Sequence, residues 1–361
     1  MSDHTTAPTL VRDLLGSCPA PFNGYDRVLL GHGSGGRLSH DLITGVFLPA
    51  LRNAVLERLE DQATCAVPGF ADHRLALTTD SFVVRPIFFP GGDIGRLAVH
   101  GTINDLAVGG ARPLFLTAAF ILEEGLSLDD LRRVVGSMKA AADEAGVVIV
   151  AGDTKVVDRG KGDQIFITTT AVGLVPAGRA LSAGNARPGD RVIVSGTIGD
   201  HGMAIMSVRE GLEFETTLES DTAALHELTE AMLQASDGIR AMRDPTRGGV
   251  SSALNEIAIA SNVGVELIET TIPVREPVRG ACEILGLDPL YVANEGKLVA
   301  IVAAAAADVV VAAMREHPLG RQASIIGEIT SEHPRTVVLR SVAGGARVVP
   351  MLAGEQLPRI C

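Results

Sequence analysis

Residues 75–108, LALTTDSFVVRPIFFPGGDIGRLAVHGTINDLAV, contain the pattern that decides the fold of this chain. The first of them, Leu75–Thr79, form a β-type run that ends at Asp80. Residues 93–108 follow as a predicted helix, with Asp93 as its N-cap and an apolar face at helical spacing. A strand that ends at an aspartate and leads into a helix is typical of proteins that mix both types of element.

The alternation of β-type and helix-type patterns continues along the chain. A helix is expected after the N-cap residue Ser127, and the Gly- and Pro-containing stretch Ala183–Asp190 looks like a linker. Strands are predicted at Leu114–Leu122, Val147–Ala151 (buried), Ile165–Val175 and Arg191–Ser195, and near 264–268, 298–302, 324–328 and 336–339. Further helices are predicted near 199–210, 222–236, 247–261 and 276–285.

These patterns predict an α/β or α+β chain of two domains with a flexible C-terminal tail. The chain has 361 residues, of which 46% are hydrophobic, and this is enough for two cores. The expected division is an N-terminal extension (1–27), an N-terminal α/β domain (28–182), a C-terminal α/β domain (183–348) and the tail (349–361).

The net charge of −12 argues against a nucleic-acid backbone as the main partner, because no basic stripe can replace its counterions. The first residues lack the basic start and apolar stretch of a signal peptide, so a cytoplasmic location is expected. The apolar run Leu298–Met314 is short for a membrane span and contains Asp308, which favours a strand followed by an alanine-rich helix. The cysteines fit no zinc or disulfide framework, which favours a reducing compartment: Cys18, Cys65, Cys282 and Cys361.

Four acidic clusters stand at the ends of predicted elements, where α/β proteins place ligands. Each aspartate alone is more typical of a helix cap or a turn, but their joint occurrence favours a shared site. Carboxylates without a matching basic cluster repel one another unless a cation lies between them, and Mg²⁺ often shares such ligands with nucleotide phosphates. The clusters supply the candidate metal and cofactor residues Asp80, Asn104, Asp105, Asp153, Thr154, Lys155 and Asp244.

A glycine-rich loop and two single residues are further candidates. The loop supplies Gly33, Ser34, Gly35 and Gly36, whose backbone N–H groups can approach an anion closely. It is neither a Walker A loop nor a dinucleotide-binding fingerprint. A flexible turn is the alternative interpretation of this loop. Glu295 is a candidate base if it faces a nucleotide cleft, and its segment is otherwise typical of a turn. His201 opens a predicted helix, where a capping or solvated role is favoured over catalysis.

The chain ends with a cysteine in the stretch Leu357–Cys361. Pro358 and the upstream Gly354 predict a tail that is neither helix nor ladder strand. Counted from Pro350, the extended tail would reach roughly 35–40 Å at about 3.3 Å per residue, so its thiol could move between a site on its own protein and a site on a partner. A frayed terminus with an accidental cysteine is the alternative, and whether the tail rests inside or outside stays open.

The chain contains ten short motifs: HGSGGR (32–37), TTDSFVV (78–84), FFPGGDIG (88–95), GTINDLAVGGARP (101–113), FILEEGL (120–126), AGDTKVV (151–157), SGTIGDHG (195–202), RDPTRGG (243–249), ANEGK (293–297) and PRIC (358–361). Taken together, these motifs make the chain similar to the HypE family of hydrogenase maturation proteins, over residues 28–361. The aspartate motifs are shared with the superfamily of aminoimidazole ribonucleotide synthetase, selenophosphate synthetase and thiamine-monophosphate kinase, whereas the terminal PRIC singles out the HypE branch.

The resemblance implies a homodimer of two-domain chains whose N-terminal domains pair, with ATP bound near the interface. It also implies a reaction. A carbamoyltransferase of the HypF family places a carbamoyl group on the C-terminal thiol, and the protein uses ATP to dehydrate this thiocarboxamide to a thiocyanate. The cyano group then goes to iron on a HypC–HypD scaffold, as a ligand of nickel–iron hydrogenase.

The same resemblance implies roles for the candidate residues. Cys361 would carry the substrate, Lys155 would contact the phosphates, and the loop 33–36 would wrap phosphate or the incoming tail. Glu295 is the first candidate for the base that removes the amide proton, and Lys155 is the second. Mg²⁺ would be held by Asp80, Asp105, Asp153 and Asp244.

Two alternatives remain beside the dehydratase. In the first, the protein is a non-enzymatic carrier whose tail relays a group or a metal, but a single thiol without a second soft ligand is a poor metal site. In the second, it is a kinase similar to selenophosphate synthetase. That branch keeps a reactive Cys or Sec in the glycine-rich loop, and the loop here contains none.

Overall fold

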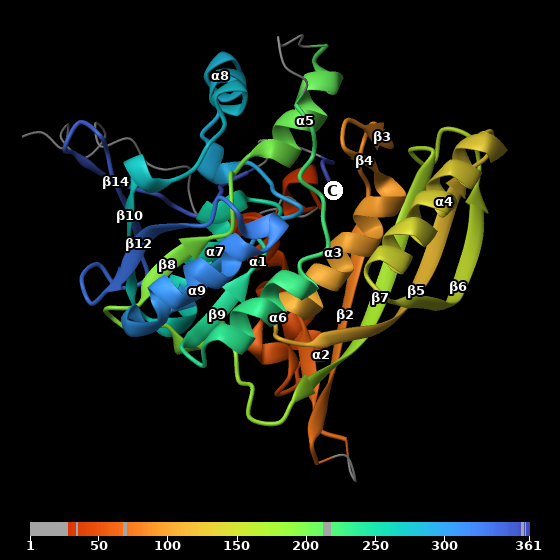
Figure 1. Ribbon diagram of the computed structural model, residues 1–361. Coiled ribbons are helices and arrows are strands. Elements are labelled where there is room, and N and C mark those ends of the chain that lie inside the picture. The colour runs from red at the N-terminus through yellow and green to blue at the C-terminus, as the bar shows by residue number, and fades with distance from the viewer. Residues whose placement is uncertain (1–27, 34, 68–70, 212–217, 355–356, 358) are drawn as a thin grey trace, which may run out of the picture.

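The computed structural model describes residues 28–33, 35–67, 71–211, 218–354, 357 and 359–361. Two sheets built from successive halves of the chain lie side by side (Figure 1). The first uses strands between Ala63 and Pro176, and the larger second sheet uses strands between Arg191 and Val348. The chain thus has the mixed helix-and-sheet architecture in two halves that its sequence predicts.

The first sheet has the strand order β1-β2-β7-β5-β6, in which only β5 and β6 are parallel neighbours. Its strands are β1 (Ala63–Cys65), β2 (His73–Phe82), β5 (Arg112–Glu123), β6 (Val148–Val157) and β7 (Ile165–Pro176). Helices α3 (Ile94–Val108) and α4 (Leu128–Glu144) cover one face of this sheet (Figure 1). The short hairpin β3 (Phe88–Phe89) and β4 (Gly92–Asp93) precedes α3.

The second sheet has the strand order β14-β13-β10-β12-β8-β11-β9 and is covered on both faces. Its strands are β8 (Arg191–Val194), β9 (Ile239–Arg243), β10 (Gly264–Ile268), β11 (Val299–Val302), β12 (Ser324–Thr330), β13 (Val337–Arg340) and β14 (Ala346–Val348). In β8, Val192 and Val194 pack in the core formed with α7 (Gly249–Ser261), while Ile193 packs with α6 (His226–Ala235) and α9 (Ala304–Glu316). Because successive strand residues point to opposite faces, this two-sided burial explains why the strands are continuous apolar runs.

Several local predictions are confirmed. The Asp93 carboxylate caps α3 by accepting hydrogen bonds from the N–H groups of Gly95 at 2.7 Å and Arg96 at 3.0 Å. Ser127 caps α4 in the same way, with the N–H of Asp129 donating at 3.2 Å. The helix α8 (Glu276–Leu285) has the predicted bounds, and α5 (Asp200–Arg209) lies within one residue of them.

The prediction of a buried strand at Val147–Ala151 is wrong. Most of β6 is exposed, and it forms the edge of the first sheet beyond β5. Its valine-rich sequence is typical of a buried strand, but sequence alone does not show whether a strand lies at the edge of its sheet, where it has a neighbour on one side only.

The predicted linker connects the two sheets and is itself packed. Residues Ala183–Asn185 form the short 3₁₀ helix η4, and Ala183 and Ala186 are buried in the core beneath α7. The apolar run questioned as a membrane span divides into β11 and α9, as predicted. Among the described residues, no helix is long and apolar enough to cross a membrane.

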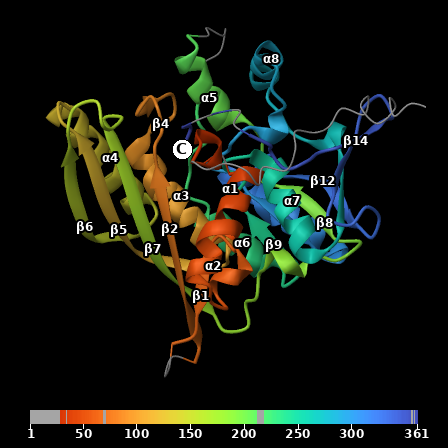
Figure 2. The same cartoon turned by 180° about the vertical axis from the view of Figure 1, so that it is seen from behind.

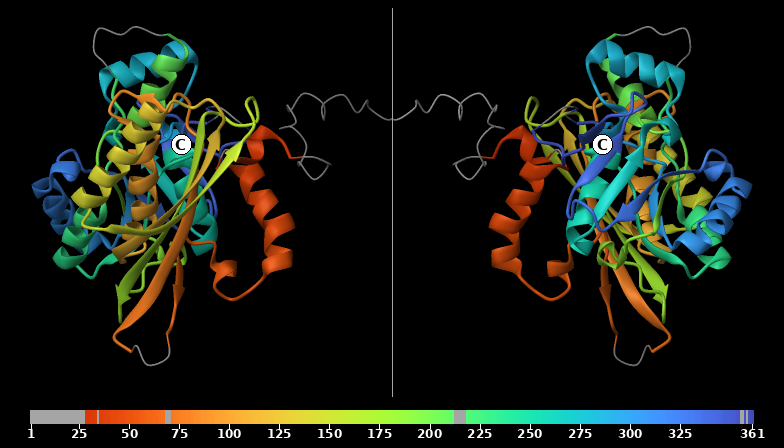
Figure 3. Two further views of the ribbon diagram at one scale, coloured as in Figure 1. Left: turned by 90° about the vertical axis from the view of Figure 1, so that its right-hand side faces the viewer. Right: turned by 90° about the vertical axis from the view of Figure 1, so that its left-hand side faces the viewer.

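The N-terminal helical segment stands apart from both sheets. It comprises η1 (Leu30–Gly33), α1 (Arg37–Leu42), the π-helical turn η2 (Ile43–Phe47), α2 (Leu48–Leu51) and η3 (Leu56–Arg58). Figure 3 shows it on the side of the first sheet opposite to α3 and α4. Its large apolar side chains Val46, Phe47 and Leu51 are exposed.

The end of the tail lies inside the molecule, beside β2, α3 and α1 (Figure 2). Cys361 is only 6% exposed and Ile360 only 2%. No helix or ladder strand is assigned to the described tail residues, as predicted. The sequence left the resting position of the tail open, and the structure places the thiol within the fold.

Candidate active site

The terminal thiol lies in a buried, charged environment. A hydrogen bond links its side chain to Glu295, and the charges of Arg247 and Asp80 act on it. Burial raises the pKa of the Cys361 thiol well above its usual range; Arg247 opposes this effect, while Glu295 and Asp80 add to it. The resting thiol is therefore protonated at neutral pH, and it lies next to the residue predicted as a base.

Three of the four predicted aspartates converge near this thiol. Asp80 lies in β2, Asp105 in the last turn of α3, and Asp244 directly after β9. Burial and the charges of Asp244 and Asp80 raise the pKa of Asp105 well above its usual range, although its carboxylate accepts a hydrogen bond of 2.6 Å from Thr78. Burial also raises the pKa of Asp80. These carboxyl groups repel one another in a region that disfavours charge.

Asp61 is a fourth member of this cluster, and sequence reasoning missed it. Burial, followed by the charge of Asp61, raises the pKa of Asp244 to about 8. Asp61 itself forms an ion pair with the buried Arg243, which also lies 3.5 Å from Glu256. Asp61 precedes a strand of only three residues, β1, so no extended pattern marked its position.

Glu295 is almost fully buried, and three neighbours fix its backbone. Asp221 accepts a hydrogen bond of 3.0 Å from its N–H, and the amide of Asn104 donates to its carbonyl at 3.1 Å. Asn294 donates to the carbonyl of Pro245 at 3.0 Å and accepts from the N–H of Gly199 at 2.7 Å. Burial raises the pKa of Glu295 well above its usual range, and the charges of Asp244 and Asp80 add to this effect.

Asn104 therefore joins the two halves of the chain. Its amide also donates to the carbonyl of Ala223 at 3.0 Å, and its oxygen accepts from the N–H of Leu225 at 2.8 Å. Both N–H bonds of the amide are used within the protein, and the side chain is 1% exposed. In this arrangement Asn104 positions Glu295 relative to α3.

Asp153, Thr154 and Lys155 lie apart from the cluster, on the exposed edge strand β6. The Lys155 ammonium contacts the Asp153 carboxylate at 2.7 Å. Across the sheet, Asp153 pairs with Ala119, which pairs with Thr168, which pairs with Ser81. Three strand spacings correspond to about 14 Å, and Ser81 and Asp80 point to opposite faces as successive strand residues. Within one chain, Asp153 does not approach Asp80.

The glycine-rich loop lies against the tail and the loop that follows β9. Arg247 donates to the carbonyl of Gly33 at 2.8 Å, and the N–H of Arg37 donates to the carbonyl of Leu352 at 2.9 Å. Gly35 has a φ of +72°, and a Cβ at Gly36 would lie 2.2 Å from the Leu352 carbonyl oxygen. Glycine is therefore required at both positions by conformation and close approach. Ser34 lies outside the described residues.

His201 does not have the capping or solvated role that its position predicted. It is fully buried in α5, and its Nε2 lies 2.5 Å from the carbonyl oxygen of Ile360. Its Nδ1 lies 2.7 Å from the Ser220 hydroxyl, and the ring meets Phe89 edge-on. The sequence could not reveal these contacts, because the tail is about 160 residues away along the chain.

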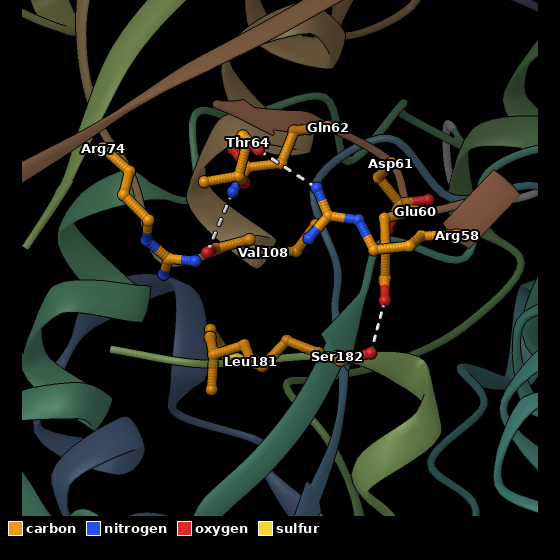
Figure 4. A pocket seen from close by; sticks show the side chains of 11 residues that line it. Arg58, Glu60, Asp61, Gln62, Thr64, Arg74, Val108, Leu181 and Ser182 are labelled. Atoms are coloured by element: carbon orange, nitrogen blue, oxygen red, sulfur yellow. Dashed lines mark hydrogen bonds between the residues drawn. The ribbon is translucent and has the colours of Figure 1, made fainter. Parts of the chain in front are cut away.

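A small cavity lies where the two sheets meet, next to Asp61 (Figure 4). Its volume is about 60 Å³, far below the ~300–1,000 Å³ typical of small-molecule sites. Several of its polar side chains are already paired: Ser182 donates to Glu60 at 2.5 Å, and Arg58 donates to the Thr64 carbonyl at 3.0 Å. This cavity has room for water but not for a nucleotide.

No three His, Cys, Asp or Glu side chains in the described part of the chain are arranged to hold a metal ion by themselves. Among the described residues, the Oε1 atom of Glu295 is one of several buried side-chain atoms without a hydrogen-bond partner. Together with the raised pKa values of Asp80, Asp105 and Asp244, it marks a region where positive charge would be stabilising.

Comparison with known proteins places the chain in a family. Residues 60–175 match the model of the AIR synthase related protein N-terminal domain, and residues 187–340 match that of the C-terminal domain. Carbamoyl dehydratase HypE of Azotobacter vinelandii is 59% identical over 330 residues, which cover 91% of this chain and 96% of that protein.

Two solved structures are also similar. Hydrogenase maturation protein HypE in complex with ATP is 50% identical with a TM-score of 0.78, covering 93% of this chain and 100% of that one. A chain of a HypE–HypF complex is 48% identical with a TM-score of 0.81, and the match covers 86% of this chain and 99% of that one. With both halves matched and identity this high over nearly its whole length, the chain belongs to the carbamoyl dehydratase HypE family of AIR synthase related proteins.

Proposed function

We propose that this protein is an ATP-dependent carbamoyl dehydratase that acts on a carboxamide carried by its own Cys361. The observation that supports this most is the placement of the terminal thiol, buried and hydrogen-bonded to Glu295 beside Asp80 and Arg247. A frayed terminus would have no reason to bring a thiol to a cluster of carboxyl groups. A relative described as carbamoyl dehydratase and another bound to ATP agree with this function.

The reaction requires an amide oxygen to leave, which is very unfavourable without activation. ATP would transfer its terminal phosphoryl group to the carboxamide oxygen while the nitrogen gives one of its two protons to a base, giving ADP and a phosphorylated imidate. The nitrogen then loses its remaining proton to a base, the carbon–oxygen bond breaks, and phosphate departs to leave a thiocyanate on Cys361. Positioning and neutralisation of charge contribute most to phosphoryl transfer.

Glu295 is our first candidate for the base, because it contacts the thiol that would carry the substrate. Its raised pKa makes its carboxylate a stronger proton acceptor than an ordinary carboxylate. Arg247 lowers the pKa of Glu295 and lies beside Cys361, so it is suited to stabilise the negative charge that develops on the transferred group. Lys155 remains the second candidate.

Mg²⁺ bound with ATP fits the carboxyl cluster. Asp80, Asp105 and Asp244 would hold it, with Asp61 as an additional neighbour. Phosphate oxygens would complete the ligands, as is usual for magnesium at nucleotide sites. The bound ion would neutralise charge on the phosphates. The loop 33–36 would contact the tail or a phosphate from the other side.

A homodimer would explain the position of Asp153 and Lys155. On one chain they lie three strands from Asp80, so they would serve the site of a second copy. The edge strand β6 and its neighbour β5 also expose apolar side chains that a partner would cover: Phe115, Ile121, Val148, Val150 and Val156. Exposed apolar surface on an edge strand is typical of an interaction site.

Two protein partners follow from the proposed reaction. A carbamoyltransferase of the HypF family would load Cys361, in agreement with the HypE–HypF complex of a relative. A HypC–HypD scaffold would receive the cyano group on iron. Both steps need the tail to leave its buried position, so the predicted mobility of the tail belongs to this proposal.

Intact-mass measurement tests the function directly. Protein carbamoylated by its partner is measured before and after addition of Mg·ATP, and loss of one water from the group on Cys361 is expected. A carbamoyl group that stays unchanged while ATP is bound would instead support a carrier. ATP turnover without carbamoylated thiol, with phosphate passed to another acceptor, would support a kinase.

A further inference from the structure

In residues 359–361, each main-chain oxygen accepts a hydrogen bond from another part of the fold. The Arg359 carbonyl accepts hydrogen bonds from the Arg85 N–H at 3.1 Å and from the Arg209 guanidinium at 2.7 Å. The Ile360 carbonyl pairs with His201 at 2.5 Å, and the Cys361 carbonyl accepts from the Val83 N–H at 3.1 Å. The fold therefore recognises the backbone of residues 359–361 as well as the thiol.

His201 is held in the state needed for this contact. The Ile360 carbonyl can only accept, so Nε2 carries the hydrogen, and Nδ1 accepts from the Ser220 hydroxyl at 2.7 Å. Burial lowers the pKa of His201, which keeps the imidazole neutral and preserves this arrangement at neutral pH. Its backbone lies at the start of α5, a rigid element of the second half of the chain.

Arg209 binds the tail from the other end of the same helix. Its guanidinium also donates to the Arg85 carbonyl at 2.6 Å, so it joins the tail to the segment after β2. The Ile360 side chain is buried in the same core cluster as Ile205. Helix α5 thus binds the tail through His201 and Arg209, which lie two turns apart on one face of the helix with Ile205 between them.

We propose that His201 and Arg209 are positioning residues that bind the carbonyls of Ile360 and Arg359 and thereby place the Cys361 thiol at Glu295. This inference rests on the proposed function, in which the same tail must visit a carbamoyltransferase. Loss of either residue would then change the rates of carbamoylation and of dehydration in opposite directions. Weaker docking exposes the thiol to the partner but removes it from the dehydration site.

The first experiment measures docking without any reaction. The full-length protein is treated with a maleimide, and the peptide that follows Glu355 is released with a glutamate-specific protease and quantified by mass. Loss of one buried hydrogen bond should raise the labelling rate of Cys361 by about 5- to 30-fold in His201→Ala. His201→Gln, whose amide can donate from a similar position, should restore most of the protection. An unchanged rate in His201→Ala would overturn the proposal.

The second experiment follows the two chemical steps. In His201→Ala and Arg209→Ala, carbamoylation by the partner should be unchanged or faster, while single-turnover dehydration falls by a similar 5- to 30-fold. His100→Ala is the matched control, because His100 is also buried but pairs with Thr222 and not with the tail. If both steps slow equally in the His201 and His100 variants, the effect is general destabilisation and the positioning role is wrong. If the wild-type protein does not dehydrate the carbamoyl group on Cys361, the proposed function fails. The labelling rate of Cys361 still decides whether His201 and Arg209 dock the tail.

Discussion

Replacing Asp244 by Asn should make the protein more stable at neutral pH while it impairs catalysis. Burial and the charges of Asp61 and Asp80 raise the pKa of Asp244 from 3.8 to about 8. In the unfolded chain this carboxyl ionises near its ordinary pKa, so the folded state binds the proton more tightly. The stability that depends on this proton is fully present below pH 4 and is lost as the pH rises toward 8.

The size of the effect follows from the same values. With a folded pKa of about 8, the cost of burying this carboxyl at pH 7 is at most ~4 kcal/mol. Because Asp61 and Asp80 share the repulsion, we expect a gain of about 2 kcal/mol for Asp244→Asn. For a domain of this size, that gain corresponds to a rise of roughly 4–8 °C in the melting temperature.

Thermal unfolding without nucleotide or Mg²⁺ at pH 5, 7 and 8.5 measures this effect. The wild-type melting temperature should fall more steeply with pH than that of Asp244→Asn, and the difference between the two proteins should be smallest at pH 5. Added Mg²⁺ with a non-hydrolysable ATP analogue should stabilise the wild type more than the variant. Asp237→Asn, at an exposed aspartate of the same half, is the control. Equal pH slopes for Asp244→Asn and wild type would refute the reasoning.

Four other outcomes are expected. Glu295→Gln should slow single-turnover dehydration of pre-carbamoylated protein by about 10²–10⁴-fold while ATP still binds, and a near-normal rate would leave Lys155 as the main candidate base. Cys361→Ala should abolish carbamoylation but retain ATP binding in calorimetry; loss of binding would contradict a substrate-carrying thiol. Asp80→Asn should weaken Mg·ATP binding and stop dehydration without preventing carbamoylation, whereas unchanged ATP turnover would count against the metal assignment. Val150→Asp should shift the protein to monomer in sedimentation, and an intact dimer would place the interface elsewhere.

The sequence by itself determined the elements and the nature of the chemistry. Caps such as Asp93 and Ser127 act within a few residues, so local patterns locate helix starts well. The aspartates at element ends were recognised because ligand sites in α/β folds lie there. The terminal cysteine was recognisable for a different reason: its position at the end of the sequence can be read without any knowledge of the fold.

Only the tertiary structure decided which of these residues meet. Asp153 and Asp80 have equivalent sequence contexts, yet strand order separates them by three positions in the sheet. Asp61 joined the cluster, and His201 became a contact of the tail, through pairings across long stretches of chain. Strand order, edge position and the seat of a terminus depend on contacts between distant segments, and local sequence patterns contain no information on those contacts.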